Sequence, residues 1–338
     1  MKLALVASAH GFGHLTRLLA IGEELRVLGV EPTLFTAAPP QIVEESLPGA
    51  RLVPWAVDVG LVQQDSLTED IGATRTALGE RCADAAISRL AEALTPFDRV
   101  VSDTAAPALE AARRAKVDAV AMGNFDWAWT YRRYPGLAAW ADRFSAWQRP
   151  HPGLSLWPGP GLREFDRTAA VGLIGRVRPP HRVAERACLV SFGGLGLRHL
   201  DALLPRIDGL TWVLAPPMAP LARPDCRFVT GVPYPSLVAG CDLVFTKPGY
   251  GILAECILGG TGIVWAHRGA FPEAPFLEAP MRARGDEKVT ASPSDPPAFR
   301  QALARAIAVR LGRGAPTGGR ASEAARVAER LLRSNPIS

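Results

Sequence analysis

Short apolar runs that lead through a glycine turn into a helical pattern occur in both halves of this sequence. One run ends near residue 8 and precedes a turn at residues 10–14, and a second run, 187–191, precedes a turn at 192–196. Near-continuous apolar runs are typical of buried parallel strands, which are joined through helices. The repeated strand–turn–helix series predicts two doubly wound α/β units, with ligands beyond the carboxyl ends of the strands.

A third glycine turn lies in the stretch KPGYGILAE, residues 247–255. It joins the apolar run 243–245 to a helical pattern, so the first backbone N–H groups of that helix lack partners and favour an anion. Gly249 and Gly251 let a ligand approach the backbone closely. Glu255, about one helical turn beyond, could accept hydrogen bonds from a sugar's hydroxyls. The alternative is an ordinary strand–helix turn with a solvated Glu.

The length of 338 residues corresponds to about two domains. Many Pro and Gly residues and little periodicity indicate that the connection lies within 145–187. We expect an N-terminal unit over residues 1–160, a connecting segment over 161–186 and a C-terminal unit over 187–316. Residues 317–338 contain an amphipathic helix that we expect to pack back toward the N-terminal unit. The default ligand site is a cleft between the units.

Composition argues against several classes of protein. The chain is 48% hydrophobic and 21% charged, and no apolar run is as long as a membrane span. The apolar N-terminal run ends in a His/Gly cluster and continues into a helix, so we interpret it as a strand and not as a signal peptide. The five cysteines are scattered without metal-ligand spacing, which argues against a disulfide framework or a zinc site. We therefore expect a cytoplasmic protein.

The net charge of +5 comes almost entirely from dispersed arginines, which disfavours a nucleic-acid partner. A mild positive field suits an anionic small substrate or an anionic membrane surface. Tryptophans and arginines of predicted loops in the first half could make a peripheral membrane contact or could form a lid; they are Trp140, Arg143, Trp147 and Arg149.

His14 follows a glycine pair after the first predicted strand, so its ring is expected at the predicted cleft. A neutral imidazole there could take a proton from an attacking hydroxyl, an effect of roughly 10²–10⁴-fold. Asp103 ends another strand of the same predicted sheet and, if it reaches the His14 ring, would fix its tautomer. The alternative is that both residues cap helices. His10, before the turn, is the rival base.

The turn at Gly193 and Gly194 is a candidate cradle for phosphate. Its spacing is not GxGxxG, which disfavours a nicotinamide dinucleotide, and no Walker A sequence occurs. A diphosphate held between this turn and the turn at 249–251 fits better. Arg268 and Lys247 could add positive charge there, although surface or helix-end cations are the alternative.

Two further candidates follow predicted strands. Glu273 could accept hydrogen bonds from sugar hydroxyls, or it could be an acid at the start of a helix. Asn124 and Trp127 lie in an aromatic segment beyond a strand of the first half. Aromatic side chains there could stack on a sugar or an apolar acceptor, or could pack as core under a loop.

Together these motifs resemble the GT-B glycosyltransferase superfamily. The arrangement is similar to the enzyme that adds N-acetylglucosamine to the lipid-linked peptidoglycan precursor, and to the UDP-sugar glycosyltransferases of plants. The strongest likeness is to the glycosyltransferase-like N-terminal part of plant arabinokinase and its bacterial relatives; the kinase half has no counterpart here. The stretches that carry the likeness are HGFGHLTR (10–17), NFDWAW (124–129), FGG (192–194), KPGYGILAE (247–255) and RGAFPEAPFLE (268–278).

The resemblance implies a GT-B fold, in which two doubly wound, Rossmann-like units face one another across a cleft. It implies that His14 is the base that activates the acceptor and that Asp103 orients this base. The side chains expected at the acceptor are Phe12, Asn124 and Trp127.

For the C-terminal unit the resemblance implies a nucleotide-sugar site. Glu255 matches the acid that holds the nucleotide's ribose, and Glu273 and Arg268 are expected near the donor sugar and its phosphates. The paired Asp-Gln that grips the donor sugar in the plant enzymes is not visible, so the sugar is left open. The residues expected at the diphosphate are Gly193, Gly194, Gly249, Tyr250 and Gly251.

These expectations describe an inverting, metal-independent glycosyltransferase with His14 as base. It would move a hexosyl or N-acetylhexosaminyl group from a nucleotide-diphosphate donor, UDP-linked, to a hydroxyl of a small-molecule or lipid-linked acceptor. No Asp-x-Asp stands at a predicted strand end, so we expect no metal and no cofactor beyond the nucleotide sugar. The alternatives are a nucleotide-sugar epimerase or hydrolase and a non-catalytic sugar-nucleotide sensor. The His14–Asp103 pair favours an enzyme.

Overall fold

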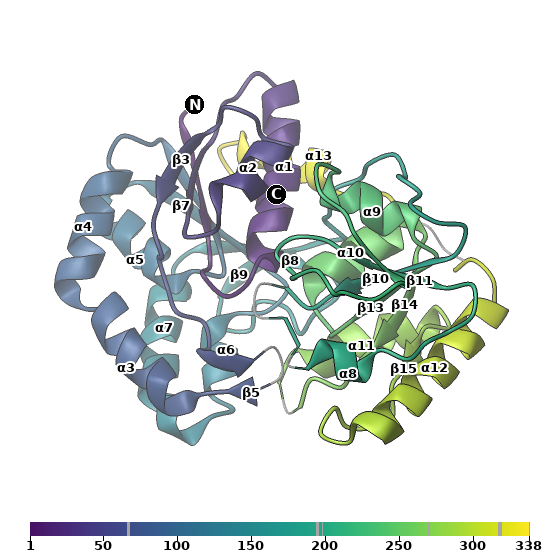
Figure 1. Cartoon of the computed structure of the whole chain (residues 1–338). Coiled ribbons are helices and arrows are strands. Elements are labelled where there is room, and N and C mark those ends of the chain that lie inside the picture. The colour runs from purple at the N-terminus through teal and green to yellow at the C-terminus, as the bar shows by residue number, and fades with distance from the viewer. Residues whose placement is uncertain (66–67, 194–195, 198, 270, 317–319, 338) are drawn as a thin grey trace. The chain divides into compact units, whose positions relative to one another are not determined.

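A computed structural model gives the fold, and Figure 1 shows its elements. The chain separates into two compact units, the first formed by residues 1–62, 69–175 and 322–338, and the second by 63–68 and 176–321. The residues that the structure describes are 1–65, 68–193, 196–197, 199–269, 271–316 and 320–337.

The first unit contains a seven-stranded parallel sheet in the order β3-β2-β1-β6-β7-β8-β9. Its central strands are buried along their whole length, as their apolar sequences predict. The strands are β1 (Leu3–Ala7), β2 (Thr33–Thr36), β3 (Arg51–Pro54), β6 (Arg99–Asp103), β7 (Asp118–Gly123), β8 (Pro152–Leu156) and β9 (Arg167–Val171). A separate two-stranded sheet joins β4 (Gln63–Asp65) and β5 (Thr68–Glu69).

Helices flank this sheet (Figure 1). The helices α4 and α5 pack against each other and cover a core that includes Val6, Val100 and Leu109. Helix α13 packs against α1, so the C-terminal residues belong to the first unit. The helices are α1 (Gly13–Val27), α2 (Pro40–Ser46), α3 (Ile71–Arg81), α4 (Asp84–Leu94), α5 (Ala106–Ala115), α6 (Trp127–Tyr131), α7 (Ala138–Gln148), α13 (Ala324–Leu331) and the 3₁₀ turn η1 (Pro135–Leu137).

The strands β8 and β9 lie in the Pro- and Gly-rich range 145–187, where the sequence analysis expected an irregular connection. Each has five residues, as β1 and β6 do, and the two lie at one end of the sheet order. A Cβ atom at Gly153 would lie only 2.7 Å from Leu162 Cδ1, so a larger residue would collide with Leu162 at this position of β8. Such strands lack the apolar periodicity that sequence analysis relies on.

The second unit contains a six-stranded parallel sheet in the order β12-β11-β10-β13-β14-β15. The core on one side of it gathers aromatic rings, among them Phe192, Trp212, Phe245 and Phe299. The elements are β10 (Ala187–Ser191), α8 (Leu200–Leu203), β11 (Thr211–Leu214), β12 (Cys226–Phe228), α9 (Tyr234–Gly240), β13 (Leu243–Thr246), α10 (Tyr250–Gly259), β14 (Gly262–Trp265), α11 (Ala274–Ala283), β15 (Glu287–Lys288) and α12 (Pro296–Gly312).

Each sheet has a point where the strand order reverses. In the first unit this point lies at the neighbouring strands β1 and β6, and in the second at β10 and β13. Ligands of open α/β sheets bind beyond the carboxyl ends of the strands at such a point. The residues that follow these four strands are therefore the candidates for a ligand site.

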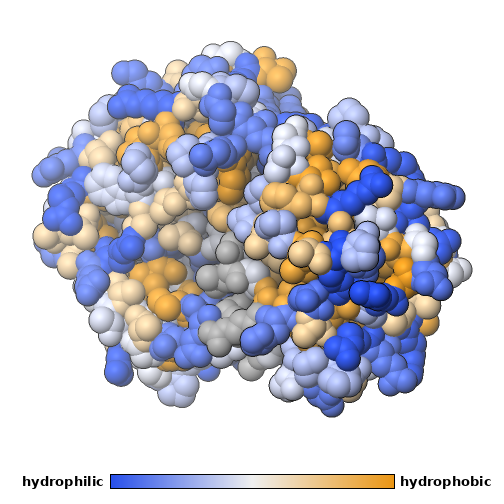
Figure 2. Space-filling model, viewed as in Figure 1, coloured by the Kyte–Doolittle hydropathy of each residue, from blue (hydrophilic) through white to orange (hydrophobic). Residues whose placement is uncertain are grey.

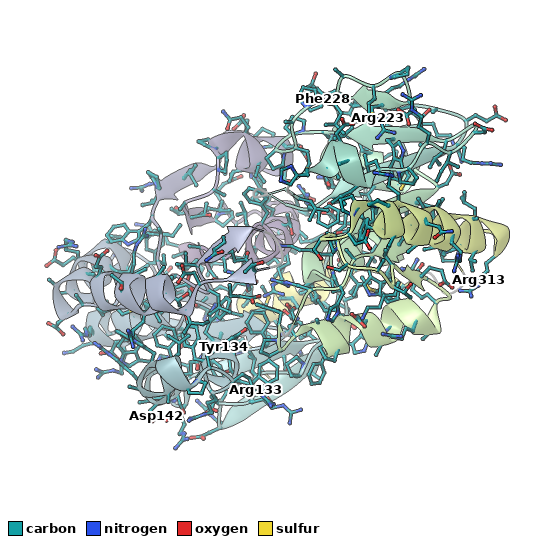
Figure 3. The ribbon with its side chains drawn as sticks, turned by 60° about the horizontal axis from the view of Figure 1, so that its bottom comes forward. Arg133, Tyr134, Asp142, Arg223, Phe228 and Arg313 are labelled. Carbon is teal, nitrogen blue, oxygen red and sulfur yellow. The ribbon has the colours of Figure 1, made fainter. Side chains whose placement is uncertain are left out.

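One face of the molecule shows a mixed surface. Hydrophilic and hydrophobic side chains alternate over the face seen in Figure 2. Arginines of the second unit are paired with acids: Arg223 Nη2 lies 2.5 Å from Asp225 Oδ2, and Arg313 Nη1 lies 2.6 Å from Glu287 Oε1 (both arginines are labelled in Figure 3). Within the described part of the chain, no helix has both the length and the hydrophobicity to cross a bilayer.

Candidate active site

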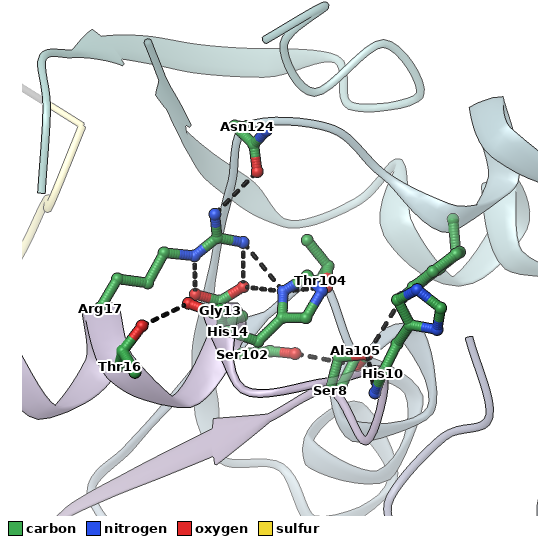
Figure 4. A network of polar contacts seen from close by, with 12 residues as sticks. Ser8, His10, Gly13, His14, Thr16, Arg17, Ser102, Thr104, Ala105 and Asn124 are labelled. Atoms are coloured by element: carbon green, nitrogen blue, oxygen red, sulfur yellow. Dashed lines mark hydrogen bonds and ion pairs between the residues drawn. The ribbon is translucent and has the colours of Figure 1, made fainter. Parts of the chain in front are cut away.

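His14 and Asp103 meet at the carboxyl edge of the first sheet. His14 is the second residue of α1, which follows β1, and Asp103 is the last residue of β6, in register with Ala7 of β1. The Nδ1 atom of His14 lies 2.9 Å from Asp103 Oδ1, and both side chains are buried (Figure 4). A carboxylate only accepts, so a hydrogen bond between these atoms requires the tautomer with its proton on Nδ1, which leaves a lone pair on Nε2.

Arg17 is a third member of this site, which the sequence analysis did not single out. Its Nε and Nη2 atoms donate to the two oxygens of Asp103, and its Nη1 donates to Asn124 Oδ1 at 2.7 Å (Figure 4). Its Nη2 also lies 2.9 Å from His14 Nδ1. The side chain is 1% exposed. One signal existed, because the i,i+3 spacing from His14 places Arg17 on the same helix face.

The charge of Asp103 is set by these contacts. Complete burial by itself would raise the pKa of this carboxyl, but the charge and hydrogen bonds of Arg17, with the hydrogen bond of His14, outweigh burial and lower the pKa below its usual value. Asp103 is therefore ionised at neutral pH and acts as a fixed acceptor for the His14 ring.

The backbone after β6 is bent to complete this site. Thr104 has a left-handed φ of 57°, and its hydroxyl lies 3.2 Å from His14 Nδ1. This conformation is costly for a threonine and is held by the surrounding structure. Gly123 at the end of β7 makes room, because a Cβ there would lie 2.5 Å from the Thr104 methyl group.

The three residues expected at the acceptor differ in position. Asn124 is fully buried and joins the polar network through Arg17 and the Pro158 carbonyl, to which its amide donates at 3.3 Å. Trp127 is also fully buried, and its Nε1 donates to Ser8 Oγ at 3.2 Å. Phe12, the residue before α1, is partly exposed. Trp127 thus belongs to the buried core of the first unit.

A second buried carboxyl, Asp58, lies beside the same site and was missed. Its Oδ1 accepts from the Ala9 amide at 2.7 Å and from Ser8 Oγ at 3.0 Å. Its Oδ2 is buried without a hydrogen-bond partner in the described part of the chain. Burial raises the pKa of Asp58, with a smaller rise from the charge of Asp103. Asp58 lies in a segment without periodicity, so the sequence carried no signal for it.

Replacing Asp58 with Asn is expected to flatten the dependence of stability on pH. A folded-state pKa above the unfolded value favours the folded protein at low pH, and this contribution is lost as pH rises through the folded pKa. Asn keeps the Oδ1 acceptor but has no charge to bury. We therefore expect the difference in the free energy of unfolding, variant minus wild type, to increase as pH rises from 4 to 7. Urea unfolding at several pH values measures this difference.

The exposed Asp208, replaced with Asn, is the matched control and should leave the pH profile unchanged. A variant Asp58→Asn whose stability follows the wild-type profile would show that the Asp58 carboxyl is not perturbed by burial.

In the second unit, glycine turns follow β10 and β13. Gly193 has φ 69°, a left-handed conformation that favours glycine; Gly194 lies outside the described residues. Gly249 precedes α10, and Tyr250 and Gly251 are the first two residues of that helix. No side chain of the described residues caps this helix end. The N-terminus of a helix is a favourable position for an anion.

Arg268 contacts the turn before α10. Its Nη1 donates to the Pro248 carbonyl at 3.1 Å, and its guanidinium carbon lies 3.6 Å from the centre of the Phe271 ring. Glu273 stands at the N-cap position of α11. Its Oε2 atom lies 3.6 Å from Nη1 of Arg268. Both charged side chains are buried. The structure thus brings Arg268 and Glu273 together at the turn. Arg268 is not a surface cation, whereas Glu273 does lie at the start of a helix, as one alternative had it.

Glu255 is not a solvated acid. It is 5% exposed, and its Oε1 lies 2.8 Å from Nη2 and 2.9 Å from Nε of Arg176. Arg176 was missed, because it lies in the Pro- and Gly-rich range that carries no periodicity. Within the described residues, no group of three or more His, Cys, Asp or Glu side chains is arranged to hold a metal ion.

Two parallel doubly wound sheets with these strand orders define a GT-B fold, and solved structures support this assignment. The glycosyltransferase of kitacinnamycin superposes with a TM-score of 0.60 at 18% identity, covering 100% of this chain and 99% of that chain. The glycosyltransferase VinC in complex with DTDP gives 0.57 at 19% identity, covering 98% and 100%. UGT89C1 of Arabidopsis thaliana complexed with quercetin gives 0.60 at 12% identity, covering 99% and 96%.

Among curated proteins, the chain is similar to L-arabinokinase of Arabidopsis thaliana, with 28% identity over 310 residues. This match covers 82% of this chain but only 29% of the arabinokinase. No family model matches the sequence. The resemblance to GT-B glycosyltransferases and to part of arabinokinase, inferred from the motifs, is thereby confirmed.

Proposed function

We propose that this protein is an inverting, metal-independent glycosyltransferase. It transfers a hexosyl or N-acetylhexosaminyl group from a nucleotide-diphosphate donor, UDP-linked, to a hydroxyl of a small-molecule or lipid-linked acceptor in the cytoplasm. The observation that carries the proposal is the buried contact of His14 with Asp103 at the switch point of the first sheet. Two of the solved structures with the same fold, those of the kitacinnamycin enzyme and VinC, are glycosyltransferases by name, which supports sugar transfer.

In this proposal His14 is the general base. Asp103 holds the ring with Nε2 unprotonated, and Nε2 takes the proton of the acceptor hydroxyl as its oxygen attacks the anomeric carbon. The leaving diphosphate departs from the opposite face of the sugar, so one displacement inverts the anomeric configuration. The reaction requires that a donor bound by the second unit reach His14 of the first.

The leaving diphosphate acquires negative charge as the glycosidic bond breaks. The N-terminus of α10 carries the positive end of the helix dipole, and Arg268, which donates to the Pro248 carbonyl, adds a positive charge at the same turn. Preorganised dipoles of this kind stabilise developing charge strongly in a site shielded from water. We assign to them the role that a divalent cation has in other transferases.

A screen of nucleotide sugars tests this proposal. At least one UDP-sugar is expected to raise the melting temperature, because a ligand that binds only the folded state stabilises it. With a hydroxyl-bearing acceptor, turnover of that donor should persist in excess EDTA. Complete loss of turnover in EDTA, restored by a divalent ion, would contradict metal independence. Rapid release of free sugar without acceptor would instead identify a hydrolase.

A further inference from the structure

Asp58 binds the start of the turn that leads from β1 to His14. Its side chain is 1% exposed, and its Oδ1 accepts hydrogen bonds from the Ala9 amide at 2.7 Å and from the Ser8 hydroxyl at 3.0 Å. Ser8 and Ala9 directly follow β1, whereas Asp58 lies 50 positions from Ser8 in the chain. A side chain from a distant segment thus fixes the first two residues of this turn.

Asp58 also determines the direction of the Ser8 hydroxyl. Because the single hydroxyl hydrogen is donated to Asp58, the lone pairs of Ser8 Oγ are available to accept. They accept from Trp127 Nε1 at 3.2 Å and from the His10 amide at 3.4 Å. The backbone amide of Ser8 donates to the Asp103 carbonyl at 3.2 Å. Ser8 (labelled in Figure 4) therefore connects Asp58 to several parts of the candidate site.

Trp127 is the part of this network that lies beside the base. The centres of the Trp127 and His14 rings are 6.3 Å apart, and the Phe125 ring meets His14 edge-on at 5.8 Å. Phe125 and Trp127 are also in edge-to-face contact at 5.0 Å. The Trp127 side chain is fully buried, so its N–H group needs an acceptor within the protein, which Ser8 supplies. The direction of one hydroxyl thus affects a ring that borders the imidazole.

Stability alone does not account for a carboxyl at this place. Burying a polar group costs free energy unless hydrogen bonds compensate for it, and among the described residues only Oδ1 of Asp58 has hydrogen-bond partners. Oδ1 can accept whether the carboxyl is ionised or carries a proton on its other oxygen. The contacts with Ser8 and Ala9 therefore do not depend on the charge of Asp58. Its contribution is an acceptor at a fixed position.

We propose that Asp58 is a positioning residue for His14, because it fixes the turn that carries His14 and, through Ser8, the Trp127 ring that borders the imidazole. This inference rests on the proposed function, in which His14 is the base. A displacement of about 1 Å at a reacting group can lower a rate about 10²-fold. Asp58 therefore affects the chemical step, whereas the residues assigned to the donor belong to the second unit.

Steady-state kinetics of the full-length protein tests the inference. Asp58→Leu removes the acceptor at similar volume and should lower kcat about tenfold to a hundredfold, with little change in KM for the donor. Asp58→Asn keeps the Oδ1 acceptor and should restore kcat to within a few-fold of wild type. A loss in Asp58→Asn as large as that in Asp58→Leu would overturn the inference, because the acceptor would then not be the cause.

A double-mutant cycle shows whether Asp58 acts through Ser8. Ser8→Ala removes the shared hydroxyl and should lower kcat by about tenfold. The double variant S8A/D58L should lose little more than Asp58→Leu alone, since residues of one hydrogen-bond network are not additive. A loss equal to the product of the two single losses would overturn the inference. If Asp58→Leu does not fold, a wild-type kcat in Ser8→Ala overturns it.

A measurement that needs no activity separates this inference from the proposed function. ¹⁵N NMR of the histidine rings reports which nitrogen of His14 carries the proton, and the His14 signals are those lost in His14→Asn. Wild type is expected to hold the proton on Nδ1, next to Asp103, whereas Asp58→Leu and Ser8→Ala should show a mixture of both tautomers. If wild type transfers no sugar, the proposed function fails, and unchanged His14 signals in both variants would overturn the inference as well.

Glu110→Leu is the matched control. Glu110 is another buried carboxyl of the first unit, 5% exposed, but its hydrogen bonds go to Arg113 and Arg114 of its own helix. Its replacement should leave kcat within a few-fold of wild type and the His14 signals unchanged. If Glu110→Leu lowers kcat as much as Asp58→Leu does, the effect comes from the loss of any buried acid, and the inference is overturned.

Discussion

Replacing His14 with Asn is expected to lower kcat for sugar transfer by about 10²–10⁴-fold, the usual contribution of a well-placed general base. The Asn side-chain amide can still donate to Asp103, in place of the Nδ1–H group that lies 2.9 Å from that carboxylate. The variant lacks only the second ring nitrogen, which accepts the proton. KM for the donor should change little, because the residues assigned to the donor belong to the second unit. Steady-state kinetics with a radiolabelled nucleotide sugar separates the two constants.

His10→Asn provides the matched control, since His10 is the rival base on the same turn. Its Nδ1 lies 3.1 Å from the Leu61 carbonyl, and a side chain at Gly60 would collide with its Cβ at 2.4 Å. These contacts give His10 a structural role, so its replacement should leave kcat within a few-fold of wild type. The opposite pattern, with kcat lost in His10→Asn and kept in His14→Asn, would assign the base to His10.

The proximity of His14 and Asp103 could be predicted because it depends on topology. Both residues follow buried apolar strands, and the carboxyl ends of parallel strands lie at one edge of a sheet. The prediction needed only that β1 and β6 be neighbours, which the structure shows with Ala7 opposite Asp103. The glycine turns could be predicted for the same reason. A glycine turn directly after a strand can be recognised from neighbouring residues alone. The left-handed φ at Gly193, which favours glycine, is likewise a property of the local backbone.

The partners of these residues could not be predicted in the same way. Arg17 shares a helix face with His14, but the spacing alone does not show that its side chain is buried, and an arginine is rarely fully buried unless it is paired. Asp58 and Arg176 lie in irregular segments, where the direction of a side chain depends on the path of the chain in three dimensions. The sequence located Trp127 after β7 but could not determine that its ring points inward.

Replacing Arg17 with Met is expected to lower the free energy of unfolding by about 3–5 kcal/mol, the cost of leaving a buried charge without its partner. Asp103 is fully buried and accepts two hydrogen bonds from Arg17, and Asn124 would lose its bond as well. Arg17→Lys should restore part of the loss, because an ammonium supplies charge without the fork that reaches both oxygens. Urea unfolding at neutral pH measures these differences.

The pH dependence distinguishes this cause from a general loss of packing. Arg17 lowers the pKa of Asp103 in the folded protein, so the stabilisation is present above the unfolded pKa and is lost as pH falls through the folded pKa. The difference in the free energy of unfolding between wild type and Arg17→Met should therefore become smaller as pH falls. Arg26→Met, on the same helix, removes a partly exposed ion pair with Glu31 and should cost about 1 kcal/mol or less. If Arg17→Met is no more costly than this control, Asp103 does not depend on Arg17 for its charge, and the polar network around His14 has another source of stability.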